Sequence, residues 1–489
     1  MGAAPPVVPV QDRVTASPQV IVVGGGFAGL AAAARLVRGG ARVTLLERRP
    51  FLGGRAYSFT DTATGDVLDN GPHAFMGAYT ELLGFLREIG AEDAIAFQPR
   101  LCVPMADSCR GVAALAAPAV PGPLQGLAAL LAFPLLSRGD RLRLLAGAVR
   151  LVTLRPRALA GRTVAEVLSA VGQPPETRRC FWDPLAVATL NEDPERAAAA
   201  PFAAVLRKGF LSGARAARFG VARGPLGDAY AEPARAAIER AGGTVRTGAA
   251  VAEVAIAGGI ATGVVLRDGS RLPADAVILA VPASALPRLL PVSLREAAPL
   301  RSLAQVDTSP IVSVHLWLGR AVTIGRPDAG APFVGLLGAR AQWLFDCGPS
   351  RAGGHRIASV TSGARFWDGA DDDTIAAAVV ADARAMLPDL ASVPVARAHV
   401  VRERHATLSL TPAAERARPP TTTSVPNLFL AGDWVQTGLP ATIESAVVSG
   451  RRAAHATQDY VVGRSGVWGD SGTRDRCAAA AAGEERAAI

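Results

Sequence analysis

The chain has 489 residues, of which 50% are hydrophobic and only 5% aromatic, enough for two or three domains with sizeable cores. Its formal net charge of +9 is carried almost wholly by arginine, and Lys208 is the only lysine. No RNP-like, zinc-finger or helix-turn-helix pattern accompanies this charge, so we expect no nucleic-acid partner. The 5 cysteines are scattered without the spacing of a metal site. This predicts a reducing compartment, no structural disulfide and no metal.

The first element with a chemical signature is a glycine turn. It follows residues 1–18, a Pro/Ala-rich leader without a signal-peptide pattern that we expect to be disordered. The apolar strand 20–23 runs into Gly24-Gly25-Gly26-Phe27-Ala28-Gly29 and an Ala-rich helix, 30–37. Gly24 permits the tight turn, Gly26 lets the backbone approach a pyrophosphate, and Gly29 lets the helix pack on the strand. The helix start then directs its N–H groups at the phosphates, so the segment predicts a dinucleotide site.

A second strand, 42–47, ends on the carboxylate of Glu47. Glu47 follows Gly29 by 18 residues, where an acid accepts hydrogen bonds from an adenosine ribose. Arg48 and then Gly53-Gly54-Arg55 add a second glycine pair and a guanidinium, which a plain nicotinamide dehydrogenase does not need. This addition predicts a second wall over the pyrophosphate of a permanently held flavin nucleotide.

The segment 124–157 combines an apolar run with arginines. Its first 13 residues, broken by Pro134, are too short to span a bilayer. An apolar run with an arginine-rich flank fits a helix lying in a membrane interface, and the alternative is a cap over the substrate cavity. We favour the interface. It predicts peripheral membrane contact of a cytoplasmic protein, on the inner face of the cytoplasmic membrane.

The chain then returns to the nucleotide-binding part and completes it near residue 430. A turn and strand at 241–251, a ribbon at 260–272 and a buried strand at 276–281 precede the last motif. That motif is an apolar strand at 428–431, a Gly432-Asp433 turn, and a helix opened by Pro440 or Thr442. Two half-sites, one at each end of the chain, predict that both close around one large cofactor. Residues 463–489 are expected to be a disordered tail.

These two half-sites resemble the flavoprotein family of amine oxidases, protoporphyrinogen oxidases and carotenoid desaturases. The resemblance implies FAD as the cofactor and an α/β fold, in which a Rossmann-type FAD-binding domain of the GR2-like flavoproteins is interleaved with an α+β substrate domain. The FAD domain would contain residues 19–75, 216–300 and 425–460, and the substrate domain residues 76–215 and 301–424. The first substrate segment looks helical and the second contains strand-like runs at 311–318 and 399–403.

The same resemblance implies where the cofactor is held. Val251 would lie near the adenine, Asp433 near the ribityl–pyrophosphate region, and the helix start at 442–446 near the flavin ring. A helix N-terminus there stabilises negative charge on a reduced flavin. The alternative for Asp433 is an ordinary turn acid. The expected cofactor-binding residues are Gly24, Gly26, Phe27, Ala28, Gly29, Glu47, Arg48, Gly54, Arg55, Gly71, Pro72, His73, Val251, Gly432, Asp433, Pro440, Ala441, Thr442 and Ile443.

Motifs outside the cofactor core are similar to those of the squalene-associated FAD-dependent desaturases, the hydroxysqualene dehydroxylases. The motifs lie at residues 69–79, 181–185, 190–195, 205–207 and 438–444. Pro72 is a departure, because the subfamily is expected to carry glutamine there. The resemblance implies a long-chain isoprenoid substrate: hydroxysqualene would lose its hydroxyl as water and take hydride from reduced FAD to become squalene. The electron donor for FAD is not identified by the sequence.

The reaction needs an acid for the departing hydroxyl. His73 is the first candidate, since histidine titrates near neutrality, and its alternative is a histidine bonded to backbone. Asp183 is the second candidate, and its alternative is a helix cap or turn residue. Two rival activities are a carotenoid desaturase, which moves hydride onto FAD, and an amine oxidase, which needs a lysine near the flavin and an aromatic cage. For the lysine, the sequence offers only Lys208, in a helical stretch. For the aromatic cage, the C-terminal motif offers only Trp434.

Overall fold

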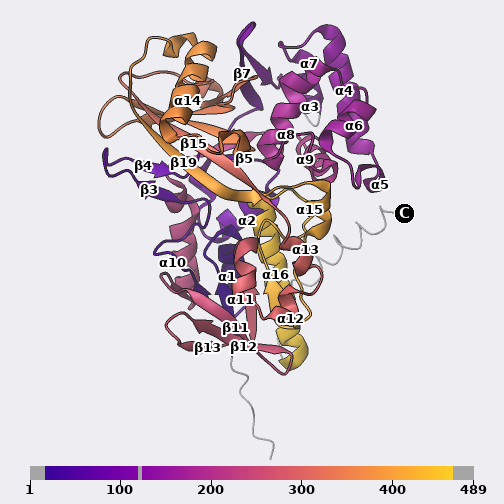
Figure 1. Cartoon of the computed structure of the whole chain (residues 1–489), viewed down its shortest axis with the longest axis vertical. Coiled ribbons are helices and arrows are strands. Elements are labelled where there is room, and N and C mark those ends of the chain that lie inside the picture. Colours follow the sequence, from indigo (N-terminus) through magenta and orange to yellow (C-terminus); the bar gives the residue numbers. More distant parts are fainter. Residues whose placement is uncertain (1–16, 119–123, 466–489) are drawn as a thin grey trace, which may run out of the picture.

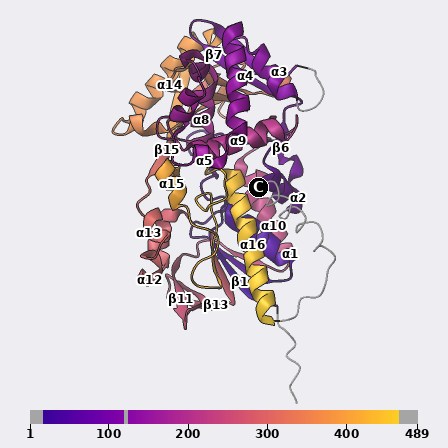
Figure 2. The ribbon, with the colours of Figure 1, turned by 90° about the vertical axis from the view of Figure 1, so that its right-hand side faces the viewer.

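The computed structural model describes residues 17–118 and 124–465, so the expected leader and tail lie almost wholly outside the described residues. The molecule is elongated, with the nucleotide-binding strands in its lower half and a second sheet with a layer of helices in its upper half (Figure 1). The long helix α16 (Ile443–Ser465) runs down one side of the lower half (Figure 2). It ends two residues after residue 463, where the tail was predicted to begin.

The lower half is built on a five-stranded parallel sheet in the order β10-β2-β1-β14-β20. Its strands are β1 (Gln19–Val23), β2 (Arg42–Leu46), β10 (Thr244–Arg246), β14 (Ala276–Leu279) and β20 (Leu428–Leu430). Both faces of the central strands are covered, which explains why they read as apolar runs. Val20 and Val22 point to the helices, whereas Ile21 and Val23 point to the opposite core. The predicted Rossmann-type domain is therefore confirmed.

Helices cover one face of this sheet and a β-ribbon covers the other. The helical face carries α1 (Phe27–Arg38), α2 (Thr80–Glu88), α10 (Glu232–Arg240) and α16. The ribbon consists of β11 (Val251–Ala257), β12 (Ile260–Leu266) and β13 (Arg271–Pro273), with α11 (Leu286–Leu289) beside it. Leu82, Phe85 and Leu86 of α2 are buried in the same core as α1 and α16. Helix α2 therefore packs in the cofactor half, although it follows the domain boundary predicted after residue 75.

A seven-stranded sheet organises the upper half, in the order β19-β15-β18-β17-β16-β7-β8. Its strands are β7 (Cys102–Asp107), β8 (Gly111–Ala116), β15 (Thr308–Leu318), β16 (Phe333–Leu336), β17 (Trp343–Pro349), β18 (His355–Ser362) and β19 (Val395–Leu408). The strand-like runs predicted after residue 300 lie in β15 and β19. Strands β7 and β8 fall in a segment that we expected to be helical, so that expectation is wrong for them. Helix α14 (Asp372–Met386) packs on one face of the sheet through Ile375 and Val379.

The opposite face of this sheet is covered by a layer of helices. They are α3 (Leu124–Ala132), α4 (Arg138–Thr153), α5 (Pro156–Leu159), α6 (Val164–Ala170), α7 (Pro175–Thr177), α8 (Asp183–Leu190) and α9 (Ala199–Leu211). Thr163 and Glu166 form a capping box at the start of α6, which fixes where this helix begins. A π-helical turn, Arg178–Trp182, leads directly into α8. Across residues 17–118 and 124–465, no helix is both long and apolar enough to cross a membrane.

Candidate active site

A cavity of about 800 Å³ extends from the carboxyl ends of β1 and β2 into the upper half of the molecule. Most of the predicted cofactor-binding residues line it, although they come from opposite ends of the chain. They are Gly24, Gly26, Phe27, Ala28, Glu47, Arg48, Gly54, Arg55, Gly71, Pro72, His73, Val251, Gly432, Asp433, Ala441, Thr442 and Ile443. Gly29 and Pro440 do not line the cavity. The structure therefore brings the two predicted half-sites together.

The glycine turn is shaped by close backbone contacts. Gly24 has a φ of +112°, and a Cβ placed on it would lie 2.3 Å from the carbonyl oxygen of Ala280. A Cβ on Gly29 would lie 1.9 Å from the carbonyl oxygen of Gly24, so Gly29 allows helix packing and does not contact the cofactor space. A Cβ on Gly26 would meet only the Cα of Gly54, at 3.6 Å. This open space is where a pyrophosphate can approach the backbone.

Glu47 is held at the end of β2 by two backbone amides. The N–H of Gly25 donates to its Oε2 at 2.7 Å, and the N–H of Arg49 donates to its Oε1 at 2.8 Å. The side chain is buried but lines the cavity. Its carboxylate is thus fixed in position at the cavity, and its predicted role as a ribose acceptor stays a prediction.

An ion pair joins the two half-sites. Nη2 of Arg55 lies 2.5 Å from Oδ1 of Asp433, and Nη1 of Arg55 donates to the carbonyl oxygen of Ala406 at 2.7 Å. Burial opposes the charge of Arg55, but the carboxylates of Asp433 and Glu403 together outweigh it, and the pKa of Arg55 is raised. Asp433 is therefore more than an ordinary turn acid, because it links the second glycine wall to the C-terminal motif.

Tyr230 supports the second glycine wall and was missed by the sequence reasoning. Its hydroxyl lies 2.7 Å from the carbonyl oxygen of Gly53 and 2.8 Å from that of Ala56. Its ring stacks on Phe27, with ring centroids 3.7 Å apart. No local pattern around Tyr230 indicates this role, because the contact depends on the tertiary fold.

Two further supporting residues were also missed. Buried Arg418 donates to the backbone carbonyls of Asp433, Val435 and Leu439, which fixes the loop before α16. A Cβ on Gly450 would lie 2.1 Å from the carbonyl oxygen of Ala28, so this glycine lets α16 touch α1. A glycine inside a long helix is a signal that could have identified Gly450.

The start of α16 resolves an alternative left open by the sequence. The helix begins at Ile443, and the N–H of Ser445 donates to Oγ1 of Thr442 at 3.3 Å, so Thr442 rather than Pro440 caps it. Thr442 and Ile443 line the cavity, which directs the positive end of the helix dipole into it. An open glycine turn, a fixed ribose carboxylate, a paired guanidinium and a helix N-terminus together fit FAD.

His73 lies where the cofactor residues meet the substrate end of the cavity. Its Nδ1 is 2.7 Å from the carbonyl oxygen of Gly71, which can only accept, so Nδ1 donates and Nε2 is left for a bound molecule. Burial lowers the pKa of His73, and the nearby carboxylate of Asp69 opposes this effect. The histidine is therefore both bonded to backbone and available to the cavity.

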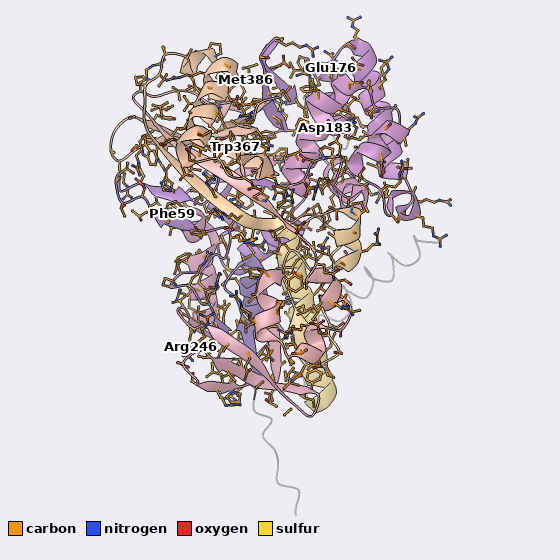
Figure 3. The ribbon with its side chains drawn as sticks, in the orientation of Figure 1. Phe59, Glu176, Asp183, Arg246, Trp367 and Met386 are labelled. Atoms are coloured by element: carbon orange, nitrogen blue, oxygen red, sulfur yellow. The ribbon has the colours of Figure 1, made fainter. Side chains whose placement is uncertain are left out.

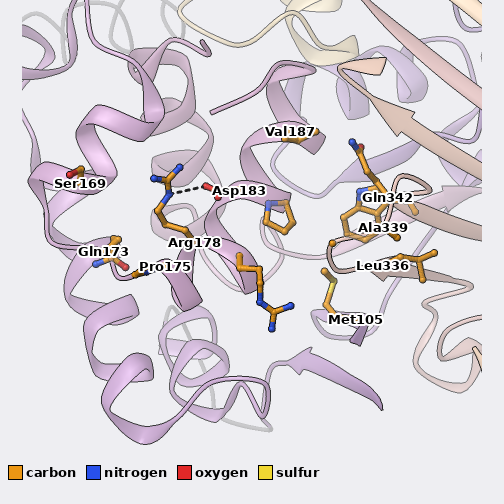
Figure 4. A pocket seen from close by; sticks show the side chains of 14 residues that line it. Met105, Ser169, Gln173, Pro175, Arg178, Asp183, Val187, Leu336, Ala339 and Gln342 are labelled. Carbon is orange, nitrogen blue, oxygen red and sulfur yellow. Dashed lines mark hydrogen bonds and ion pairs between the residues drawn. The ribbon is translucent and has the colours of Figure 1, made fainter. Parts of the chain in front are cut away.

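Asp183 does not reach this cavity. It lies among the helices of the upper half (Figure 3), where its Oδ1 is 3.3 Å from Nε of Arg178. It lines a separate pocket of about 510 Å³, which we call the outer pocket (Figure 4). The outer pocket is lined by Met105, Ser169, Gln173, Pro175, Arg178, Arg179, Asp183, Pro184, Val187, Leu336, Gly338, Ala339, Gln342 and Trp343. The structure thus separates the two candidate acids and leaves His73 beside the cofactor site.

The upper end of the cavity is apolar. Strands β7, β8, β16 and β17, helices α8 and α9, and the residue after α3 contribute side chains to it. These include Leu101, Val103, Met105, Leu115, Phe133, Phe181, Leu185, Leu206, Phe219, Phe333, Trp343 and Phe345. Such a lining fits a long hydrocarbon.

The residues that an amine oxidase would need are occupied elsewhere. Nζ of Lys208 lies 3.6 Å from Oε1 of Glu444, and Glu444 also accepts from the N–H groups of Glu81 and Leu82. The buried indole of Trp434 donates to the backbone of the loop after β14. Neither side chain lines the cavity. Within the part of the chain that the structure describes, no group of three or more potential metal ligands is found, and the four described cysteines are unpaired.

Fold and site together define an FAD-dependent oxidoreductase. The sequence model of the flavin containing amine oxidoreductases matches residues 27–457, and the chain belongs to that family. Among its relatives, it is 33% identical over 446 residues to hydroxysqualene dehydroxylase of Rhodopseudomonas palustris, covering 90% of this chain and 98% of that protein. It is 32% identical to the Sinorhizobium fredii enzyme of the same name, covering 89% and 97%. The 15-cis-phytoene desaturase of Solanum lycopersicum is 25% identical, covering 93% and 80%.

Solved structures show the same fold at low sequence identity. An oxidoreductase from Methanosarcina mazei has a TM-score of 0.70 at 17% identity, covering 89% of this chain and 100% of that one. A putrescine oxidase bound to putrescine has a TM-score of 0.67 at 18% identity, covering 91% and 99%. These likenesses concern the arrangement of the two halves of the molecule.

Proposed function

We propose that this protein reductively dehydroxylates a long isoprenoid, replacing the hydroxyl of hydroxysqualene with hydride to give squalene and water. The observation that carries the proposal is a single cavity in which the FAD-binding residues continue into an apolar end, with His73 between them. FAD, when bound and reduced, would supply the hydride. The relatives named hydroxysqualene dehydroxylase support this choice of substrate.

His73 would deliver the proton that makes the hydroxyl a leaving group. The substrate is an allylic alcohol, so breaking its C–O bond gives water and a delocalised cation that accepts the hydride. In the protonated histidine, Nδ1 stays bonded to the carbonyl of Gly71 while Nε2 donates to the departing oxygen. Because burial lowers the pKa of His73 below 6.5, its protonated form is lost within the acid range, and we expect turnover to fall as pH rises and to be already reduced at neutral pH.

The alternative activity is a phytoene-type desaturase. The likeness to the Solanum lycopersicum desaturase and the same apolar cavity favour it as the second candidate. A desaturase moves hydride onto FAD and has no hydroxyl to release. It therefore needs no protonated His73, which separates the two activities.

The test is anaerobic. The FAD-loaded protein is reduced with dithionite, mixed with hydroxysqualene, and followed by flavin absorbance while the lipid is extracted. We expect flavin reoxidation with an equal amount of squalene, slowed about 100-fold or more in His73→Gln and unchanged in the matched control Asp183→Asn. A flavin that stays reduced would refute the dehydroxylase, and oxidised enzyme with phytoene-type polyenes would then be tried.

We further propose that the surface formed by β8, α3 and α4 contacts a membrane, which would make the protein peripheral on the inner face of the cytoplasmic membrane. Four large hydrophobic residues are exposed there: Val112, Leu131, Leu142 and Val149. Exposed arginines lie on α4 and directly after it: Arg138, Arg143, Arg150, Arg155 and Arg157. Exposed apolar side chains with a cationic border fit an anionic bilayer surface. Phe133, which directly follows α3, lines the cavity, so this surface adjoins the apolar end of the cavity.

Vesicle sedimentation tests this surface. Leu142→Glu should reduce binding to anionic vesicles, whereas Val292→Glu, an equally exposed hydrophobic position in the other half of the molecule, should not. Equal loss in both variants, or no binding by the unaltered protein, would refute the proposal.

A further inference from the structure

The floor of the cavity is one face of the seven-stranded sheet. A continuous register pairs Ser313 with Val360, Val360 with Trp343, Trp343 with Gly335, and Gly335 with Met105. Residues of one row share a face of a sheet, and the four side chains of this row all line the cavity. With neighbouring strands about 4.8 Å apart, the row spans about 19 Å from β15 to β7.

One end of this row lies beside the reacting centre. A Cβ placed on Gly71 would lie 2.5 Å from Oγ of Ser313, and the carbonyl of Gly71 holds His73. The other end lies in the apolar part of the cavity, at Trp343 and Met105. The row therefore extends over the depth of the cavity, from His73 to the far wall.

The far wall is built over a glycine. A Cβ on Gly335 would lie 2.6 Å from Sδ of Met105 and 3.1 Å from Cζ3 of Trp343, so these two side chains meet over the space that the glycine leaves. Pro184 of α8 completes this wall from the helical side. Met105, Pro184 and Trp343 are the three residues that line both the cavity and the outer pocket. They form a partition between the two spaces.

The outer pocket behind the partition lies between α6–α8 and the β16–β17 hairpin. Figure 4 shows Met105 and Leu336 on the sheet side, facing the helix side that carries Arg178 and Asp183. The charged groups that line it are paired with each other or with neighbouring carboxylates. Arg178 binds Asp183 and Glu195, and Arg179 binds Glu176 and Asp107. These pairings leave the apolar walls, such as Val187, Leu336 and Ala339, for contact with a hydrocarbon.

We propose that Met105, Pro184 and Trp343 set the length of the isoprenoid chain by closing the far end of the cavity, and that the outer pocket is room that only a longer chain would use. The proposal rests on the proposed function in taking an isoprenoid as the ligand. It also gives a role to the motif at 181–185: Pro184 forms part of the partition, and Asp183 fixes Arg178 behind it.

The test measures equilibrium binding. Thirty-carbon and forty-carbon isoprenoid hydrocarbons are titrated into the oxidised, FAD-loaded protein, and the shift of the flavin spectrum reports each Kd. Trp343→Ala should improve forty-carbon binding relative to thirty-carbon binding about tenfold or more, because added methylenes become buried. Trp343→Phe should keep the partition closed and leave the relative binding of the two lengths unchanged. Met105→Ala provides a second opening if Trp343→Ala fails to retain FAD.

A second-site variant tests the role of the outer pocket. Ala339 lines that pocket and not the cavity. Ala339→Trp should therefore cancel the gain of Trp343→Ala and leave the unaltered protein's preference unchanged. Unchanged forty-carbon binding in both opened variants, or equal binding of both lengths by the unaltered protein, would overturn the proposal. Because binding needs no turnover, absence of squalene formation would refute only the proposed function.

Discussion

Breaking the Arg55–Asp433 ion pair should weaken the junction between the two ends of the chain. The relevant change is Arg55→Met, which keeps an apolar stem and removes the guanidinium. It leaves the carboxylate of Asp433 in the protein without its cation, and it frees the carbonyl of Ala406. An unpaired buried charge is costly, so both losses destabilise the folded protein.

The magnitude follows from the exposure of the two side chains. Asp433 is 7% exposed and Arg55 is 32% exposed. Removing one partner of a fully buried pair costs about 3–5 kcal/mol, and water reaching the Arg55 side reduces this, so we expect about 3 kcal/mol. Asp433→Asn should lose less, because an amide needs no cation, and the double variant should reveal coupling of about 2–3 kcal/mol.

The assay is denaturant unfolding of the FAD-loaded protein with flavin fluorescence as a second signal, for both single variants and the double variant. Arg404→Met, at an exposed arginine on β19, is the matched control and should change the free energy of unfolding by less than about 0.5 kcal/mol. Coupling below about 1 kcal/mol, with full FAD retention in Arg55→Met, would show that the pair does not hold the two half-sites together.

Three further outcomes are expected. Gly29→Ala should abolish FAD retention, because its Cβ would lie 1.9 Å from a backbone oxygen of the glycine turn. The control Gly224→Ala, at a glycine with open space around it, should retain FAD. Similar FAD content in both variants would contradict this prediction. Burial lowers the pKa of His315 from 6.5 to about 4, so the free energy of unfolding should fall by up to about 3 kcal/mol as pH falls through this window. When unfolding is measured against pH, His315→Gln should lack this part of the acid sensitivity. Lys208→Met should lower the melting temperature, since Glu444 loses a partner, but leave flavin reduction by dithionite unchanged; an altered reduction rate would place Lys208 at the flavin.

The cofactor half was predictable because its signals are local. A strand, a glycine turn and a helix are read from neighbouring residues, and Glu47 follows at a spacing fixed by that unit. The start of α16 is a local signal as well, although the sequence left Pro440 and Thr442 both open as its first residue. The pairing of Arg55 with Asp433 is not local, but the two motifs carrying these residues each require the same cofactor, which indicated that they meet.

The remaining errors concern partners that are distant in sequence. Strand β7 is a short apolar run, and its membership of the upper sheet depends on pairing with β16. Helix α2 has the same amphipathic pattern whichever half it packs on. Asp183 stands in a recognisable motif, but the turn before α8 directs it toward Arg178 and away from the cavity. Tyr230 and Arg418 act through backbone carbonyls of remote loops, for which a single sequence has no signal.

The strand order of the lower sheet has a consequence for synthesis of the protein. β20 pairs with β14 at one edge, and the segment that follows β20 supplies Asp433 and the start of α16. Until the ribosome has made residues 428–450, that edge is open and the nucleotide site lacks one side. Open edges of this kind pair with other chains. Cofactor capture must therefore wait for the late part of translation, and a chain cut short before residue 428 would be a substrate for chaperones and proteases even with its first glycine turn intact.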